Sequence, residues 1–195
     1  YVGEFKNGTY HGLGINTFAN GSKYFNALLS DIATARHTIF IETFIFTHDL
    51  LGHKMIEALL EASSRGVTIK ILVDGVGSSS FIPQAAYLNQ HGIQTKIYHP
   101  FPWHIWSWSR SVIKLPILLK TIYLILNMQR RNHRKICLID NCIAYIGSFN
   151  ISQKHLSIKD QGSNWRDTGL RLEAASFSEL TESFEQCWYH RSIHE

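Results

Sequence analysis

Cysteine is scarce in this sequence, and the few cysteines present argue against a zinc-binding protein and against a disulfide-stabilised one. Three occur among 195 residues, at Cys137, Cys142 and Cys187, without the spacing of a zinc site and without an even number for disulfide pairing. Two of them lie in apolar, strand-like sequence, so we expect buried thiols in a reducing compartment.

Long apolar runs and a signal peptide are also missing. The longest nearly continuous apolar run, from Leu115 to Leu126, is shorter than the ~20 residues that span a bilayer. No initiator methionine is present, and the chain begins in mid-pattern at Tyr1 and stops inside an apparent helix at Glu195. We therefore expect a fragment or an excised domain.

Charged residues make up only 17% of the chain, against 45% hydrophobic and 12% aromatic residues. This balance excludes disorder as the main state, and the length suits one domain with a real core. The net charge of +4 fits an anionic partner, either phospholipid headgroups or nucleic acid. Composition alone would explain the basic cluster at residues 130–135 as a solvated loop.

The first 24 residues, YVGEFKNGTYHGLGINTFANGSKY, are rich in glycine and asparagine. Asn7-Gly8 and Asn20-Gly21 are dipeptides typical of hairpin turns. The pattern resembles one MORN repeat. Such repeats normally occur in tandem, because one hairpin cannot bury its own face. Residues 1–24 are therefore either the last unit of an array or a hairpin with no role of its own.

Strand and helix patterns alternate along the rest of the chain. Apolar residues at helical spacing predict helices over 24–35, 50–65, 82–91 and 176–190. β-Branched and aromatic runs predict strands over 37–46, 67–75, 93–99, 134–140, 143–149 and 168–173. This order predicts an α/β domain with a largely buried central sheet.

Residues 101–131 break this alternation. Trp103, Trp106 and Trp108 lead into the apolar run, which is followed by Arg130 and Arg131. Tryptophans with flanking cations are typical of a segment that lies on a membrane surface. We therefore expect the three tryptophans to contact a membrane; a helix packed on the sheet or at a dimer interface is the alternative.

The stretch NHRKICLIDNCIAYIGSFN, residues 132–150, carries a candidate active site. His133 and Lys135 are two residues apart, as are Ser148 and Asn150, and side chains at that spacing on a strand share a face. Two adjacent strands would bring these four polar groups to one end of an apolar sheet, where a site is expected.

These residue types suit phosphoryl chemistry. Lys135 is a cation for phosphate oxygens, to which Ser148 and Asn150 can donate hydrogen bonds. His133 can act as a nucleophile or proton carrier near pH 7. Its ring needs a partner that holds one tautomer, and Asp167 in NWRDTGL is the candidate.

The motif H-x-K-x4-D-x6-G-S-x-N resembles the signature of the phospholipase D superfamily, and it is filled by His133, Lys135, Asp140, Gly147, Ser148 and Asn150. Residues 18–190, including GVTIKILVDGVGS and NWRDTGLRLE, are similar to the first catalytic half of bacterial cardiolipin synthases. The resemblance implies a phospholipase D-like α/β/α sandwich with a mixed central sheet. One catalytic half would occupy residues 18–195, with an apolar insertion at 101–128 and a short β-hairpin before it.

The resemblance also implies roles for individual residues. His133 would become a phosphohistidine, Asp167 would orient its ring, and Asp140 would place the strand and the lysine. Further contacts to the phosphate or the lipid would come from Gly147, Arg131 and Arg134. Most family members need no metal, and we expect neither a metal ion nor a cofactor.

One part of the family pattern is missing. Members join two such motifs across a pseudo-twofold axis, and the second histidine protonates the leaving alcohol. No other histidine in this chain stands in an H-x-K arrangement, and Ala174-Ala175 replaces the usual Gly-Pro after RLE. We therefore expect the second half to come from a twin subunit or from downstream sequence, and an isolated monomer to be inactive.

Three functions remain open. The first is membrane-associated phosphatidyl transfer of the cardiolipin synthase type, using phosphatidylglycerol or a related phospholipid at the cytoplasmic side of a bacterial inner membrane. The second is phosphodiester hydrolysis by a homodimer, as a phospholipase D or a nuclease, with nucleic acid the less favoured partner. The third is a non-catalytic half-domain in a scaffold.

Overall fold

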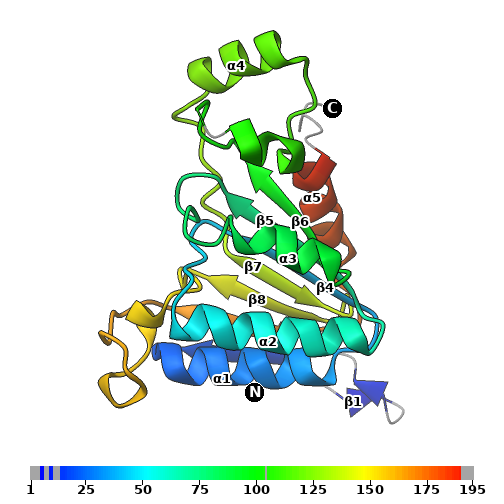
Figure 1. Ribbon diagram of the computed structural model, residues 1–195. Coiled ribbons are helices and arrows are strands. Elements are labelled where there is room, and N and C mark those ends of the chain that lie inside the picture. The colour runs from blue at the N-terminus through cyan, green and yellow to red at the C-terminus, as the bar shows by residue number, and fades with distance from the viewer. Residues whose placement is uncertain (1–4, 7–8, 11–13, 104, 190–195) are drawn as a thin grey trace.

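The chain folds around a seven-stranded mixed sheet with helices on both faces (Figure 1). This computed structural model describes residues 5–6, 9–10, 14–103 and 105–189. The strand order is β3-β9-β8-β7-β4-β5-β6. The strands are β3 (Gly14–Phe18), β4 (Thr38–Thr43), β5 (Thr68–Asp74), β6 (Gln94–Tyr98), β7 (Ile136–Ile139), β8 (Ile143–Gly147) and β9 (Gly169–Glu173). Neighbours in the β4-β5-β6 half are parallel and all other neighbours are antiparallel. The predicted α/β sandwich with a mixed central sheet is confirmed.

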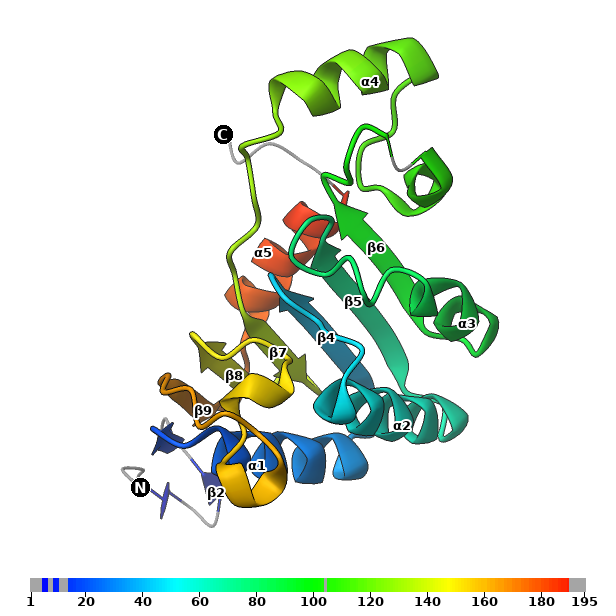
Figure 2. The same ribbon diagram turned by 60° about the vertical axis from the view of Figure 1, so that its left-hand side comes forward.

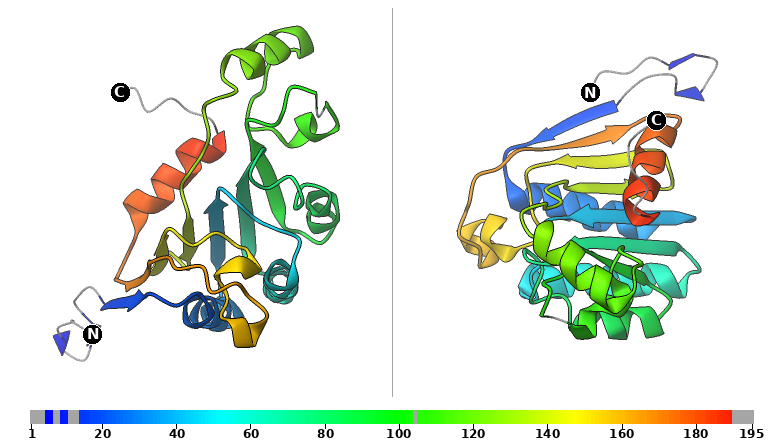
Figure 3. Two further views of the ribbon diagram at one scale, coloured as in Figure 1. Left: turned by 90° about the vertical axis from the view of Figure 1, so that its left-hand side faces the viewer. Right: turned by 90° about the horizontal axis from the view of Figure 1, so that it is seen from above.

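The helices form two unequal layers. They are α1 (Gly21–Thr34), α2 (Leu50–Ser64), α3 (Gln84–Gln90), α4 (Ile117–Leu126) and α5 (Ser178–Tyr189), with 3-10 turns η1 (Ile105–Arg110), η2 (Gln153–His155) and η3 (Ile158–Asp160). Figure 3 shows α1, α2 and α3 on one face of the sheet and α5 on the other. Alternate residues of each strand supply the two cores: Ile39 and Ile41 pack with α1 and α2, while Phe40 packs with α5.

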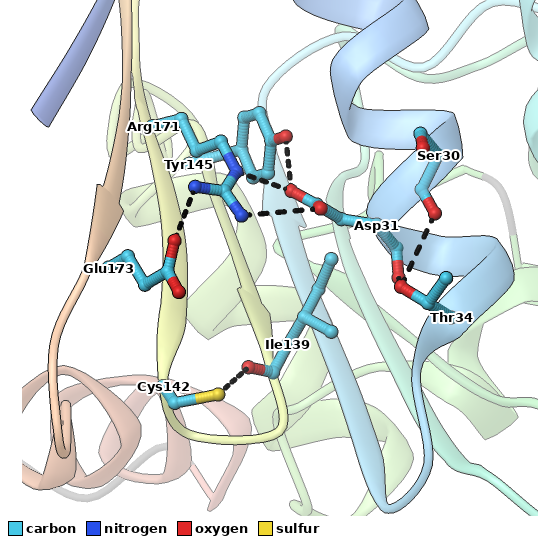
Figure 4. A network of polar contacts seen from close by, with 8 residues as sticks. All are labelled: Ser30, Asp31, Thr34, Ile139, Cys142, Tyr145, Arg171 and Glu173. Carbon is cyan, nitrogen blue, oxygen red and sulfur yellow. Dashed lines mark hydrogen bonds and ion pairs between the residues drawn. The ribbon is translucent and has the colours of Figure 1, made fainter. Parts of the chain in front are cut away.

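A polar network ties α1 to the antiparallel half of the sheet (Figure 4). Asp31 on α1 accepts hydrogen bonds from the Tyr145 hydroxyl at 2.5 Å and from Nε of Arg171 at 2.6 Å. Arg171 also pairs with Glu173 at 2.8 Å on the same strand. This network holds α1 against β8 and β9, which frame the candidate site.

The start of the chain differs from the hairpin expected over residues 1–24. Two short strands, β1 (Phe5–Lys6) and β2 (Thr9–Tyr10), form an antiparallel ladder. The next strand, β3, is not part of this ladder and pairs with β9 at the edge of the main sheet. The hairpin turn predicted at Asn20-Gly21 is wrong. Asn20 instead caps α1, its Oδ1 accepting from the backbone N–H of Lys23 at 3.0 Å.

The proposed MORN-like pattern also draws on residues 1–4, 7–8 and 11–13, which lie outside the described residues. It stays a prediction, together with the domain boundaries placed at residues 18 and 24.

The unusual segment after β6 forms a separate group of helices. Beyond β6, η1 and α4 stand at one end of the molecule, away from α1 and α2 (Figures 1 and 2). Among helices in the described part of the chain, none is long and apolar enough to cross a membrane. The apolar run therefore forms one short helix, α4, rather than a span.

Candidate active site

His133 and Lys135 lie just before β7 rather than on it, because that strand begins at Ile136. Their side chains nevertheless share one side of the chain and meet at Phe44, which follows β4. The His133 ring stacks on Phe44 with a centroid separation of 4.1 Å, and Nζ of Lys135 lies 5.6 Å from the same centroid. His133 is exposed to solvent. Phe44 thus provides a common platform for the two motif residues.

The ammonium group of Lys135 is held close to this platform. Its Nζ donates a hydrogen bond to the carbonyl oxygen of His133 at 2.8 Å. Burial lowers the pKa of Lys135, and the nearby carboxylate of Asp167 opposes that shift. The motif lysine therefore lies between the backbone of His133 and an acidic group.

Ser148 and Asn150 follow β8, at the same end of the sheet as Lys135, because Ile136 pairs with Ile146. The Ser148 hydroxyl donates to the carbonyl of Thr168 at 3.2 Å and accepts from its N–H at 3.1 Å. Oδ1 of Asn150 accepts from the N–H of Ile45 at 3.2 Å. These contacts tie the loop after β8 to β9 and to the loop that carries Phe44.

Gly147 allows a close approach of β8 and β9. A Cβ atom at Gly147 would lie 2.4 Å from the carbonyl oxygen of Thr168 and 2.7 Å from Cα of Gly169. Since both contacts are with backbone, a side chain here would push the strands apart. The glycine of the motif therefore sets the position of Ser148.

Asp140 lies at the other end of β7 from His133, in the turn to β8. Its carboxylate accepts the backbone N–H groups of Arg36, His37 and Thr38 at 2.8, 2.7 and 2.9 Å. Burial acts to raise its pKa, but these three donors hold the pKa below its usual value. Asp140 thus joins β7 to the start of β4 and stands apart from the other motif residues.

Asp167 contacts a histidine that the sequence analysis did not single out. Nδ1 of His155 lies 3.3 Å from Oδ2 of Asp167, and the backbone N–H of Asn150 donates to Nε2 of the same ring at 3.3 Å. Because Nε2 accepts, the proton of the neutral ring sits on Nδ1, facing the carboxylate. Within the described ranges, no hydrogen bond or ion pair joins Asp167 to His133.

The environment of His155 favours its neutral form. Its side chain is buried in η2, and burial lowers its pKa while Asp167 acts in the opposite direction. The only sequence signal for this residue was its position five places after Asn150, which identifies no chemistry by itself.

Two buried carboxylates hold the residues on either side of His133. Glu42 on β4 accepts a short hydrogen bond from Nδ2 of Asn132, and its other oxygen lies 3.4 Å from Nη1 of Arg134. Asp74 at the end of β5 accepts from the N–H of Asn132 at 3.2 Å. The backbone on both sides of the exposed histidine is therefore anchored to β4 and β5.

The two arginines expected to contact phosphate take part in these anchors. Arg134 also donates to the carbonyl of Ser183 at 3.4 Å, on α5. Nη1 of Arg131 donates to the carbonyl of His99 at 2.9 Å and lies 4.0 Å from Asp74. Beside His133 is a cavity of about 480 Å³, lined by Tyr98, Arg131, Asn132, His133, Arg134 and Cys187. Both arginines therefore border the same opening as the histidine.

The three tryptophans of the insertion differ in exposure. Trp103 and Trp106 are 58% and 66% exposed. Trp108 instead packs against the core on the α5 side of the sheet, and Nζ of Lys120 lies 5.5 Å from its ring centroid. Among the described residues, no three or more His, Cys, Asp or Glu side chains lie together in a way that could hold a metal ion.

The fold and the motif together define a phospholipase D-like domain. The chain resembles the solved structure of Nuc from Salmonella typhimurium, a phospholipase D family member, with a TM-score of 0.60 and 21% identity, covering 92% of this chain and 93% of that one. NucT from Helicobacter pylori is similar, with a TM-score of 0.57 and 18% identity over 91% and 94% of the two chains. At these levels of sequence identity, the similarity to the two solved structures is a similarity of fold alone.

Sequence comparison specifies the family. Residues 28–188 match the family described as "Cardiolipin synthase, PLD-like domain", and the chain belongs to this family. It is 30% identical to the cardiolipin synthase of Oceanobacillus iheyensis over 183 residues, which are 92% of this chain and 34% of that protein. It is 29% identical to the major cardiolipin synthase ClsA of Bacillus subtilis over 181 residues, again 92% and 34%. The predicted resemblance is confirmed, and the chain spans about a third of the length of these relatives.

Proposed function

We propose that this domain is one catalytic half of a phosphatidyltransferase of the cardiolipin synthase type. The observation that carries the proposal is the exposed His133 beside Lys135 on the Phe44 platform, within a chain of the cardiolipin synthase family. An exposed imidazole next to a cation suits attack on a phosphodiester. The substrate would be phosphatidylglycerol or a related phospholipid.

The reaction would run in two displacements. A nitrogen of His133 attacks the phosphatidyl phosphorus, a P–N bond forms, and the P–O bond to the first alcohol breaks. That alcohol takes a proton from the second histidine of the complete site. The second alcohol then gives its proton to the same group and attacks the phosphohistidine, which restores the free ring.

The surrounding groups would stabilise the charge on the phosphate. Lys135 neutralises the oxygens, and the amide nitrogen of Asn150 and the Ser148 hydroxyl are candidate donors. Arg131 and Arg134 add positive potential at the opening beside His133. We keep Asp167 as a candidate for orienting His133. In that role its carboxylate would contact the ring of His133 instead of the ring of His155, its present partner.

The second histidine would come from outside this chain segment. A twin subunit in a homodimer and a second half encoded downstream are the two sources, and the limited share of the relatives that this chain covers favours the downstream source. We also propose that the domain works at a membrane surface, on the cytoplasmic side of a bacterial inner membrane, with Trp103 and Trp106 in contact with lipid and Trp108 supporting them from within.

A direct assay separates this proposal from phosphodiester hydrolysis. The protein, alone and in the full coding context, would be incubated with radiolabelled phosphatidylglycerol vesicles and, separately, with plasmid DNA. We expect lipid turnover and an acid-labile, alkali-stable phosphoryl adduct that is absent in His133→Ala. His91→Ala is the matched control, because His91 is an exposed histidine just before the start of β6, whereas the end of that strand, Tyr98, borders the opening at His133.

DNA cleavage without lipid turnover would replace the transferase proposal with a nuclease working as a homodimer. An acid-stable adduct, or one that persists in His133→Ala, would show that another residue is the nucleophile.

A further inference from the structure

The helix α4 exposes an apolar surface that ordinary packing does not account for. Ile117, Leu118 and Leu126 are 77%, 72% and 78% exposed. We call the α4 face the set of its exposed apolar residues: Ile117, Leu118, Leu119, Ile122, Ile125 and Leu126. At 100° per residue these positions cover an arc of about 200°, wider than the roughly 100° stripe by which a helix packs on one core.

The lysine and the threonine of α4 both make hydrogen bonds within the protein. Lys120 is 5% exposed, and its Nζ donates to the carbonyl of Trp108 at 2.8 Å, so the one cation of the helix points inward beside Leu124. The Thr121 hydroxyl donates to the carbonyl of Ile117 at 2.9 Å. The α4 face therefore offers water almost nothing to hydrogen-bond.

The neighbouring segment exposes further apolar side chains at the same end of the molecule. Trp103, Ile105 and Trp106 are 58%, 65% and 66% exposed, and Figures 1 and 2 show η1 and α4 together at one end of the molecule. Exposed tryptophans beside aliphatic side chains are typical of the boundary between lipid tails and headgroups.

The stretch of sequence that contains α4 carries charge of one sign. No aspartate or glutamate occurs from residue 75 to residue 139. The cations in that stretch are Lys96, Arg110, Lys114, Lys120, Arg130, Arg131, Arg134 and Lys135. A second copy placed on the α4 face would bring the same cations against it, whereas an anionic membrane attracts the exposed cations on either side of α4, Lys114 and Arg130.

We propose that the α4 face, with Trp103 and Trp106, inserts into one leaflet of an anionic phospholipid membrane. The ten residues of α4 are about 15 Å long, half the ~30 Å hydrocarbon thickness, so the helix lies in the plane of the leaflet instead of crossing it. This deepens the proposed function, on which the choice of a phospholipid partner rests, by naming α4 as the element that anchors the domain. The tryptophans then mark the rim of the inserted surface.

Vesicle binding tests the inference without requiring catalysis. The whole chain would be sedimented with vesicles of phosphatidylglycerol and phosphatidylcholine, and with vesicles of phosphatidylcholine alone. Ile117→Asp places a charge on the α4 face. Ile158→Asp is the matched control, since Ile158 on η3 is also 77% exposed and lies outside residues 75–139, the stretch without aspartate or glutamate.

We expect Ile117→Asp to weaken binding to the anionic vesicles at least about tenfold, which is the scale for withdrawing one large aliphatic side chain from an apolar medium. Ile158→Asp should leave binding unchanged. Binding of the wild-type chain should be weaker on phosphatidylcholine and should fall with added salt.

Equal binding by Ile117→Asp and Ile158→Asp would overturn the proposal. If the wild-type chain is a dimer that Ile117→Asp converts to a monomer in light scattering, the α4 face is an interface between copies instead. Loss of phosphatidyl transfer with retained, α4-dependent vesicle binding would refute the proposed chemistry alone, so the two failures are distinguishable.

Discussion

Replacing Arg134 by alanine removes the guanidinium that faces the buried carboxylate of Glu42. The Glu42 side chain has no exposed surface, while the Arg134 side chain retains 30% exposure. After the substitution, the remaining side-chain partners of the carboxylate are Nδ2 of Asn132 and the thiol of Cys187. The substitution therefore tests how much the stability of the fold depends on pairing the buried Glu42 carboxylate with Arg134.

The expected cost follows from that burial. Removing one partner of a buried ion pair costs about 3–5 kcal/mol of unfolding free energy. Because Arg134 is partly exposed, water screens some of the original attraction, and we expect the lower end, about 3 kcal/mol. Arg36→Ala is the matched control: Arg36 has an exposed side chain, and its loss should cost less than about 0.5 kcal/mol.

The pH dependence gives the sharper test. Burial raises the pKa of Glu42 above the ordinary glutamate value of 4.5, although Arg134 and Asn132 oppose the shift. A carboxyl group with a higher pKa in the folded state binds more protons when folded, so its contribution to stability falls as pH rises above 4.5. Without Arg134 the pKa rises further, and the loss of stability should be larger at about pH 8 than at about pH 5.5.

Urea denaturation followed by circular dichroism measures these differences. A double variant, Glu42→Gln with Arg134→Ala, removes the charge itself and should recover much of the loss and its pH dependence. The reasoning fails if Arg134→Ala costs no more than Arg36→Ala, or if its cost is the same at both pH values.

Three further predictions concern the site. Asp140→Ala removes the acceptor of three backbone N–H groups and should cost about 2–3 kcal/mol in denaturant titrations; since the pKa of Asp140 is lowered, the wild-type chain should lose this stabilisation as pH falls below the usual aspartate range. Burial lowers the pKa of His155 although Asp167 opposes the shift, so its ring should titrate below the ordinary histidine range in proton NMR, and a midpoint above that range would contradict this reasoning. Gly147→Ala should cost more than about 2 kcal/mol because its Cβ meets the backbone of Thr168, whereas a stability change below about 0.5 kcal/mol would mean that β8 and β9 can separate freely.

Local pattern was enough to predict most of the elements. The strands around β4, β5 and β6 and the helices α1, α2 and α5 agree with the predicted ranges to within a few residues. The strand expected from residue 134 starts later, at Ile136, because the backbone N–H groups of Asn132 and Arg134 donate to the side chains of Asp74 and Asn132 instead of to a neighbouring strand. Asn20-Gly21 was misread because asparagine before glycine suits a helix cap as well as a hairpin turn.

Contacts between distant loops could not be predicted from the sequence. His155 reaches Asp167 because the segment after β8 folds back through η2 and η3 before β9 begins, a path with no periodic signal. Phe44 becomes the platform for His133 because β4 and β7 are antiparallel neighbours, so the end of one meets the start of the other. Motif spacing identified the residue types of the site but not these partners.

The pairing of β3 with β9 has a consequence for how the domain folds. The first strand of the main sheet, at residues 14–18, finds its neighbour at residues 169–173, with Ile15 opposite Leu172. During synthesis, β3 must therefore wait for nearly the whole domain to be made, while the β4-β5-β6 unit can assemble from local contacts. We expect folding to proceed from the parallel half toward the antiparallel half, so the region of the motif is ordered late.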